Sequence, residues 1–355
     1  MGLIRLLLAI SVITVHASPI FGLNFIQGQL AVEVFFMISG FYMALILSEK
    51  YSNTKTFIGN RFLKIFPTYW IVLILCLIYQ LTYYLNNPTS LEVFSFFQYQ
   101  LKPITFILLL IPNLFIFGLD LTLFFGLNPQ NGLLFFTQNF RLFDPKLYTF
   151  TLIPQAWTLS LELAFYLLVP FLNKLKTKYL LIIMSLSLAL RFFLYSRGLN
   201  HDPWTYRFFP TELVFFLSGI LMYRIYQYLK TKNFQKLSIY SFIFYFSYLI
   251  FYQFIPHERT KQIILFFFSF IFIPFIFNLF KKNKIDRFIG ELSFPVYISH
   301  FLIIDTLTHY TKLNHQYLGL TTAIISIVFS IILIKLIIHP IDHFRQSRLN
   351  AKITQ

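Results

Sequence analysis

One face of the first apolar segment carries a cation and an imidazole. Arg5 and His16 are eleven positions apart. Eleven residues at ~100° each return a helix to within about 20° of the same face, after a rise of about 16 Å. Because imidazole accepts or delivers a proton near neutral pH, this spacing suits a fixed charge at one end of a helix and acid–base or nucleophilic chemistry at the other. The alternative is a snorkelling arginine and a histidine near the outer membrane boundary.

A carboxylate lies in the second apolar segment. Glu33 is followed by the run from Phe35 to Phe41, which includes Ser39-Gly40. An ionisable residue within a membrane span indicates function by default. A carboxylate bonded to one ring nitrogen of His16 would fix its tautomer and raise the basicity of the other nitrogen. The sequence thus predicts that Glu33 supports His16, whereas Ser39-Gly40 either belongs to the site or serves helix packing alone.

Two cations stand one helical turn apart before the third segment. Arg61 and Lys64 precede Pro67 in the stretch Asn-Arg-Phe-Leu-Lys-Ile-Phe-Pro. This spacing presents both charges together and suits a phosphorylated ligand arriving from the cytoplasm. The alternative is the ordinary excess of positive residues on the inner side of a membrane.

Two later segments each carry polar side chains at helical spacing. They are Trp157, Ser160, Glu162 and Tyr166 in the first and Ser293, Tyr297 and His300 in the second. In the second segment the residues fall at i, i+4 and i+7, which is one helix face. A polar stripe on an otherwise apolar helix lines a protein interior rather than lipid. We therefore expect both sets to line a site or a channel inside the protein.

Membrane helices must position these side chains. The 355 residues are 57% hydrophobic and 12% charged, whereas soluble globular chains carry roughly 25% charged residues. Runs of ~18 or more apolar residues indicate helices that span a bilayer. Eleven candidate segments lie near 4–20, 30–48, 65–85, 104–127, 156–172, 179–196, 208–228, 237–255, 262–280, 289–309 and 317–338. No cleavage site follows the first, so we expect it to be a retained helix.

Soluble cofactor and metal chemistry has no signature in this sequence. Cys76 is the single cysteine, so no internal disulfide is possible. No glycine-rich phosphate loop and no zinc-ligand spacing appears, and we expect no metal. The net charge of +16 needs no nucleic-acid partner, because insertion into a membrane demands positive inner loops.

The positive clusters alternate along the chain and set the predicted topology. They lie at residues 50–64, 174–178, 224–236, 281–287 and 345–352. Placing all of them inside makes both termini cytoplasmic. Residues 86–156 must then start and end outside, so 104–127, which Pro112, Asn113 and Asp120 interrupt, is expected to be re-entrant or interfacial. The predicted fold is all-α, a polytopic membrane helix bundle of about ten transmembrane helices.

These pieces, in this order, resemble the membrane acyltransferase 3 family. The family pattern has an Arg or Lys ahead of a His, an acid before Phe-Phe-x-x-Ser-Gly-Phe, an Arg-x-x-Arg before Pro, Trp-Ser-Leu-x-x-Glu-x-x-Phe-Tyr, and a late Ile-Ser-Tyr-x-x-Tyr-x-x-His. The matching residues are Arg5, His16, Glu33–Phe41, Arg61, Lys64, Trp157–Tyr166, Ser293, Tyr297 and His300. Lys64, Thr158 and Phe294 depart from the pattern. Lys64 keeps a charge but loses a bidentate fork, and Phe294 puts a hydroxyl role there in doubt.

The resemblance implies a multi-pass enzyme of the inner (cytoplasmic) membrane. It would transfer an acetyl group from cytoplasmic acetyl-CoA, a substrate rather than a bound cofactor, to an extracytoplasmic glycan hydroxyl. His16 and Glu33 would be catalytic, and Arg5, Arg61 and Lys64 would hold the donor phosphates. We expect an acyltransferase 3-like domain over residues 1–345 and a cytoplasmic tail over 346–355, without the fused hydrolase-like domain that many members carry.

Several alternatives remain at this point. Lipopolysaccharide O-antigen is the favoured acceptor, while a capsule, an exopolysaccharide, a lipid-linked precursor or a small molecule would also fit the family. Outside the family, a transporter would also use buried Glu and His residues, although no two-half repeat is evident. A non-catalytic scaffold would not need His16 and Glu33 in lipid. Partners other than donor, glycan and membrane lipids, and the oligomeric state, are not predicted.

Overall fold

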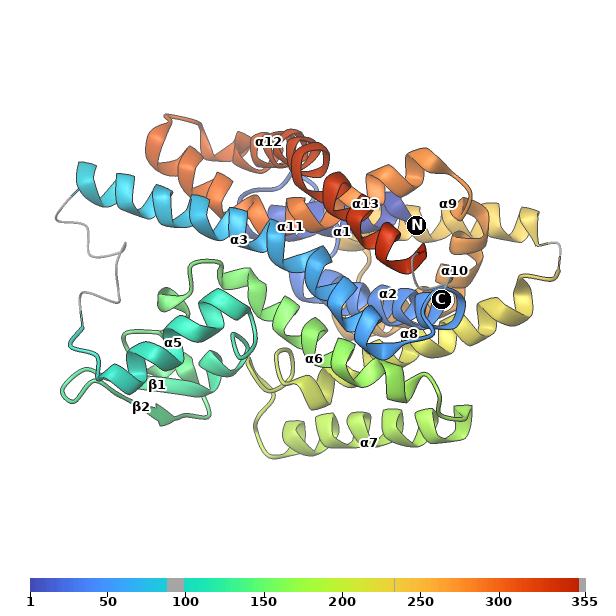
Figure 1. Ribbon diagram of the computed structural model, residues 1–355, viewed down its shortest axis with the longest axis horizontal. Helices are drawn as coiled ribbons and strands as arrows, with labels where there is room; N and C mark the ends of the chain where they lie inside the picture. Colours follow the sequence, from blue (N-terminus) through green and yellow to red (C-terminus); the bar gives the residue numbers. More distant parts are fainter. Residues whose placement is uncertain (88–98, 233, 351–355) are drawn as a thin grey trace. The chain divides into compact units, whose positions relative to one another are not determined.

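The described part of the chain folds mainly into α-helices. The computed structural model describes residues 1–87, 99–232 and 234–350. The helices are α1 Gly2–His16, α2 Gly28–Glu49, α3 Thr54–Asn86, α5 Pro103–Phe115, α6 Trp157–Leu172, α7 Thr177–Ser196, α8 Phe209–Leu229, α9 Gln235–Phe251, α10 Glu258–Phe280, α11 Lys284–Tyr310, α12 His315–Leu333 and α13 His339–Asn350 (Figure 1). A hairpin of β1 Phe125–Asn128 and β2 Leu133–Phe136 pairs antiparallel, Phe125 opposite Phe136.

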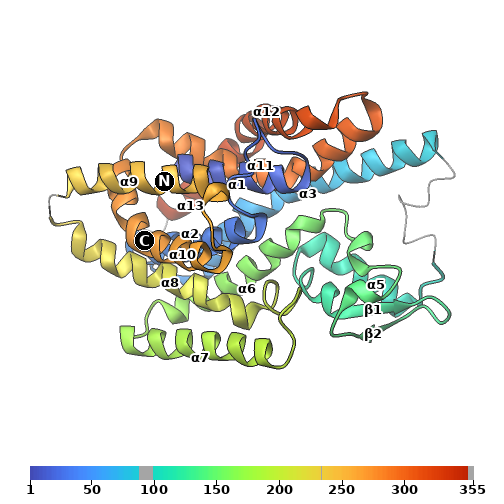
Figure 2. The ribbon, with the colours of Figure 1, turned by 180° about the vertical axis from the view of Figure 1, so that it is seen from behind.

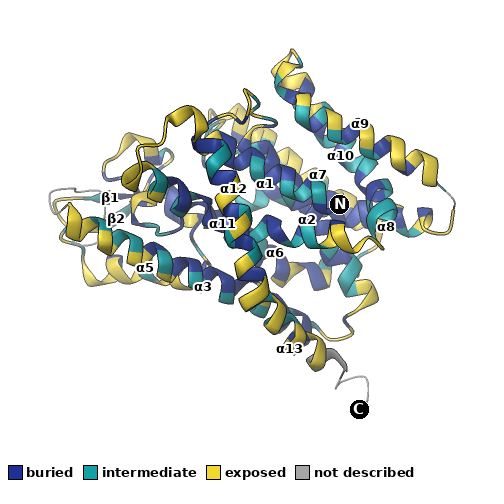
Figure 3. Cartoon of the chain, turned by 90° about the horizontal axis from the view of Figure 1, so that it is seen from above, coloured by how far each residue is buried: buried dark blue, intermediate teal, exposed yellow. Residues whose placement is uncertain are grey.

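The helices confirm the all-α polytopic fold. Among the described residues, eight helices are long and apolar enough to cross a membrane, and α1 and α5 are shorter apolar helices. The predicted total of about ten adds α1 and α8 to these eight, and α8 includes the charged Glu212 and Arg224. Burial differs strongly among the candidates. The apolar window of α2 is 72% buried and that of α7 only 17%, so α7 packs against the described chain over a much smaller part of its length. Figure 3 colours the helices by burial.

The described chain divides into two compact units. The first contains Met1–Lys64, Leu168–Met184 and Val214–Gln355, and the second contains Ile65–Leu167 and Ser185–Leu213. In the first unit, α1 packs against α11, α2 and α12, and α9 pairs with α10 (Figure 2). The helices α3, α6, α7 and α8 contribute residues to both units.

Glycine contacts and a cap fix α1 in the first unit. A Cβ at Gly2 would lie 1.6 Å from the carbonyl oxygen of Asp286 in α11, so no larger residue fits there. The Asp286 carboxylate accepts hydrogen bonds from the backbone N–H groups of Gly2 and Leu3, at 2.8 and 3.1 Å. This carboxylate satisfies amides of the first turn and opposes the helix dipole. The register of α1 against α11, and with it the position of His16, follows from these contacts.

A second close approach joins α2 to α8. A Cβ at Gly40 would lie 2.0 Å from the Phe216 carbonyl oxygen, and one at Gly219 would lie 2.2 Å from the Met37 oxygen. Small residues let membrane helices approach at backbone distance. Gly40 therefore serves packing. The neighbouring Ser39 is buried, and its Oγ has no hydrogen-bond partner among the described residues.

In the second unit, α5 is a short apolar helix whose end bonds to a neighbouring helix. Its 13 residues rise about 20 Å, which is short of the ~30 Å hydrocarbon core. Backbone groups at its end bond to α3, where Tyr69 donates to the Asn113 carbonyl at 2.5 Å and Trp70 donates to the Leu114 carbonyl at 2.8 Å. Irregular backbone is tolerated at membrane depth only where protein satisfies it. These contacts suit the predicted re-entrant segment, whose depth stays a prediction.

The Asn113 side chain ties the same helix end to the following loop. Its amide nitrogen donates to the carbonyls of Leu109 and Phe150, at 2.8 and 2.9 Å, and its oxygen accepts the Leu152 N–H at 2.8 Å. The next elements are the short hairpin and 3-10 turns. Neither strand was predicted, because four-residue apolar runs do not distinguish strand from helix.

The C-terminal part stays helical beyond the predicted last span. A π-helical turn, Ile334–Ile338, continues into α13, which ends at Asn350. The first half of the predicted tail 346–355 is thus helical, and 351–355 lie outside the described residues. Residues 88–98 of the predicted external region 86–156 also lie outside them.

Candidate active site

Two histidines from distant parts of the sequence meet in the first unit. His16 ends α1, and its Nδ1 lies 3.2 Å from Nε2 of His300 in α11. The two rings stack with centroids 5.2 Å apart and planes 18° apart, and Phe301 lies 4.5 Å from the His16 ring. His300 is fully buried whereas His16 is exposed. The pair therefore consists of an accessible imidazole supported by a buried one.

The hydrogen bonds of this pair determine its tautomers. Nδ1 of His300 lies 2.6 Å from the Tyr297 carbonyl oxygen. A carbonyl only accepts, so this Nδ1 carries the proton and Nε2 of the neutral ring is an acceptor. The His16 Nδ1 must then donate to it, which leaves Nε2 of neutral His16 unprotonated. An unprotonated imidazole nitrogen is what a general base or a nucleophile requires.

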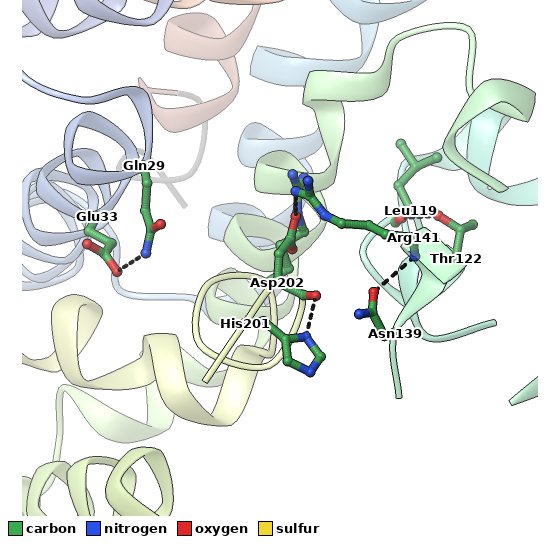
Figure 4. Close-up of polar contacts among 9 residues, drawn as sticks. Gln29, Glu33, Leu119, Thr122, Asn139, Arg141, His201 and Asp202 are labelled. Atoms are coloured by element: carbon green, nitrogen blue, oxygen red, sulfur yellow. Dashed lines mark hydrogen bonds and ion pairs between the residues drawn. The ribbon is translucent and has the colours of Figure 1, made fainter. Parts of the chain in front are cut away.

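Glu33 is buried in α2, near the start of that helix. Its carboxylate accepts a hydrogen bond from Gln29 Nε2 at 3.4 Å (Figure 4). The sequence predicts that the Glu33 carboxylate orients His16. In the structure, Nε2 of His300 lies against Nδ1 of His16, and the role of Glu33 stays a prediction. Sequence spacing put His300 on the right helix face but gave no reason to pair it with His16.

The polar stripe of α11 divides between the site and its own helix. The Tyr297 ring lies 5.8 Å from His300 and 6.4 Å from Phe35 of α2. Ser293 instead donates to the Gly290 carbonyl at 2.8 Å, within α11. Tyr297 and His300 thus lie together beside His16, whereas the Ser293 hydroxyl is engaged locally.

The predicted donor-binding cations gather in the same unit. Lys64 lies within electrostatic reach of both Arg61 and Arg5. The Arg5 guanidinium stands 5.7 Å from the Tyr42 ring, and that of Arg61 stands 5.8 Å from the Phe57 ring. Arg61 is buried and Lys64 is exposed. These three cations lie within electrostatic reach of Lys64 or are Lys64 itself. A fourth cation, Arg345, also acts on Lys64. In the sequence, Arg345 counts only among the positive residues of the inner side.

In the second unit, Ser160 bonds to the carboxylate of Asp120, which is not among the predicted site residues. Its Oγ donates to Asp120 Oδ1 at 2.6 Å and accepts the Gly118 N–H at 3.0 Å. Burial raises the pKa of the Asp120 carboxyl, and the hydrogen bond from Ser160 opposes that rise. Both Ser160 and Asp120 are buried. The contact holds the loop after α5 against α6.

The other α6 residues lie in two further contacts. Tyr166 donates to Glu162 at 3.2 Å, one turn apart as predicted for a shared face. Trp157 stacks under Arg207, whose guanidinium lies 4.3 Å from the ring, and Arg207 Nε donates to Asp202 at 2.7 Å. Arg141 also donates to Asp202, at 3.2 Å (Figure 4). Among the residues that the structure describes, no group of three His, Cys, Asp or Glu could hold a metal ion.

Comparison with known proteins matches nearly the whole chain to one family. A model of the acyltransferase 3 family, described as "Acyltransferase domain", matches residues 1–339. An "Uncharacterized protein" of Aquifex aeolicus (strain VF5) is 28% identical over 189 residues, which cover 50% of this chain and 78% of the relative. No solved structure gives a significant match.

Proposed function

The chain belongs to the acyltransferase 3 family, which makes it a membrane acyltransferase, and we propose that it is an O-acetyltransferase of cell-envelope glycans. Its donor would be acetyl-CoA on the cytoplasmic side of the inner membrane. Its acceptor would be an extracytoplasmic sugar hydroxyl, such as one of lipopolysaccharide O-antigen.

The His16–His300 pair carries the proposal. Bonding of His300 to the Tyr297 carbonyl leaves the outer nitrogen of His16 unprotonated. On the same helix face, about 16 Å away along the axis, Arg5 belongs to the cationic cluster with Arg61 and Lys64. Cations at one end would hold phosphates that cannot enter lipid, and the imidazole at the other end would meet the thioester.

In the general-base route, Nε2 of His16 takes the proton from the acceptor hydroxyl. The sugar oxygen attacks the thioester carbonyl carbon, an ester C–O bond forms, and the C–S bond breaks. The imidazolium then returns its proton to the departing CoA thiolate. His300 Nε2 would accept the hydrogen bond of the charged Nδ1–H and so stabilise the imidazolium.

In the nucleophilic route, the same Nε2 attacks the thioester carbon, the C–S bond breaks, and CoA leaves as a thiolate while the acyl-imidazolium keeps its Nδ1–H. The sugar hydroxyl then attacks the acyl carbon, the N–C bond breaks, and the hydroxyl proton passes to Nε2, which releases it to neutralise the thiolate or to water. Both routes need the same tautomer of His16. Trapping of acetyl label on His16 in the absence of glycan would select the second route.

The test is acetyl transfer by the purified protein in lipid nanodiscs. Labelled acetyl-CoA and isolated envelope glycan are supplied, free CoA is measured with a thiol reagent, and the glycan is analysed by mass spectrometry. We expect equal amounts of CoA and glycan ester. A transporter would bind or move a solute without releasing CoA. Release of CoA without glycan ester would point to another acceptor.

A further inference from the structure

The fourth cation of the cluster lies outside the part of the chain that matches the family. The family model ends at residue 339, and Arg345 stands on the following helix, α13. It is nevertheless 9% exposed, and it forms an ion pair with Asp342, one turn earlier. A terminal helix that merely followed the last span would leave this arginine in solvent.

Charge in the cluster is unbalanced. The groups that act on Lys64 are the cations Arg61, Arg5 and Arg345 and the carboxylate Asp342. Around Lys64, three positive guanidinium groups therefore face one negative carboxylate. Like charges within electrostatic reach of one another repel, and the repulsion is relieved when an anion binds among them.

Two buried guanidinium donors in the cluster lack acceptors. Arg61 is 7% exposed and Arg345 9%. Among the described residues, neither Nε–H has a hydrogen-bond partner. A buried donor left unsatisfied is costly, and a guanidinium matches the oxygens of a phosphate. These donors are an observation independent of the charge count, and they too call for an oxyanion.

Tyr51, in the loop between α2 and α3, joins the two arginines. Its hydroxyl accepts a hydrogen bond from Asn60 at 3.1 Å. Burial would raise the pKa of the Tyr51 phenol, but the charge of Arg61, hydrogen bonds from Asn60 and Arg61, and the charge of Arg345 together lower it. The guanidinium groups of Arg61 and Arg345 thus converge on one hydroxyl.

The geometry points to α13 as part of the acyl-donor site, where Arg345 binds a phosphate of the 3′-phospho-ADP portion of acyl-CoA together with Arg61 and Lys64. This inference rests on the proposed function. Asp342 neutralises Arg345 while the site is empty and is the group that the phosphate replaces. The donor site of this chain then includes an element beyond the family match, and α13 covers the nucleotide end.

Binding of CoA to the full chain in neutral phosphatidylcholine nanodiscs tests this assignment without turnover. We expect Arg345→Gln to raise the Kd for CoA about tenfold or more. The Kd for adenosine 3′,5′-bisphosphate should rise by a similar factor. Arg345→Lys should recover part of the loss, because charge returns without the fork. The matched control is Arg259→Gln, the same change at an exposed arginine of α10, which should bind CoA like the wild type.

A structural role for Arg345 predicts a different pattern. Arg345→Gln would then lower the thermal midpoint while CoA affinity per folded molecule stays at the wild-type value, and that result overturns the assignment. If Arg345→Gln does not fold, Arg345→Lys decides instead. If Arg345 binds a phosphate, the Kd of Arg345→Lys for CoA should be higher than that of the wild type. If Arg345 is only a structural cation, the two Kd values should be equal.

An anionic lipid headgroup offers the same phosphate chemistry. If it occupies the cluster, phosphatidylglycerol nanodiscs should stabilise the wild type but not Arg345→Gln, and CoA affinity should be equal in both proteins, which contradicts the donor assignment. Failure of the proposed function is separate. Tight, Arg345-dependent CoA binding without glycan acetylation would support this donor site and contradict the proposed glycan acceptor.

Discussion

Replacement of His300 by Phe separates tautomer control from simple packing. Phe keeps an aromatic ring in contact with His16 and Phe301 but removes the nitrogen that accepts the His16 Nδ1–H at 3.2 Å. The Tyr297 carbonyl also loses its partner. His16 would remain in place with its tautomer no longer specified.

The expected loss follows from the charge that develops on His16. A hydrogen bond between neutral groups contributes about 1 kcal/mol net, and one to a charged group about 1.5–3 kcal/mol. The bond strengthens as His16 becomes an imidazolium, so His300→Phe removes the difference, about 0.5–2 kcal/mol of transition-state stabilisation. At about 1.4 kcal/mol per factor of ten, kcat falls roughly twofold to thirtyfold, and KM for acetyl-CoA changes little.

The assay is steady-state glycan acetylation by purified variants in nanodiscs. His300→Gln is the matched rescue, because its amide oxygen can accept the same Nδ1–H, and it should regain most of the lost rate. His309→Phe provides the control for the substitution itself, on the same helix but at an exposed position. A His300→Phe enzyme with wild-type kcat would refute the tautomer argument, as would a His300→Gln enzyme no faster than His300→Phe.

Three further predictions address the donor site, the topology and the fold. Arg61→Ala should weaken acetyl-CoA binding far more than Lys50→Ala, measured as Kd in nanodiscs, and equal effects would reduce Arg61 to an inner-side charge. Leu142 is 75% exposed. In a Cys76→Ser background, Leu142→Cys should therefore react with an impermeant maleimide in intact cells. Labelling only after the membrane is broken would contradict the predicted topology. Asn113→Leu should lower the free energy of unfolding by about 3 kcal/mol, because three hydrogen bonds, two of them buried, are lost at about 1 kcal/mol each. An unchanged thermal midpoint would contradict this role.

Local patterns gave the helices and the residues that share a face. Long apolar runs predicted α2, α3, α10 and α12, because a bilayer requires about twenty apolar residues per span. Proline, amide and carboxylate side chains predicted the break after α5. The hairpin at Phe125–Phe136 was not predicted, since its strands are too short and too apolar to carry a period.

The partners within the site depended on packing that no local pattern encodes. His16 and His300 are 284 residues apart, and their pairing depends on the register that Gly2 and Asp286 set between α1 and α11. The sequence predicts only that Arg345 is one of the positive residues on the inner side, because its burial depends on how α13 packs. Charge and spacing in the sequence identify the polar residues that stand within apolar helices. Which of these residues contact one another is known only from the tertiary structure.

The central claim is that His16 performs the transfer, and replacement by alanine tests it most directly. His16→Ala should insert and fold, because it makes the end of α1 less polar, and CoA binding through the distant cations should persist. Acetylation of the glycan, measured by mass spectrometry at matched protein levels, should fall to background. A well-folded His16→Ala protein that still acetylates the glycan would contradict the account.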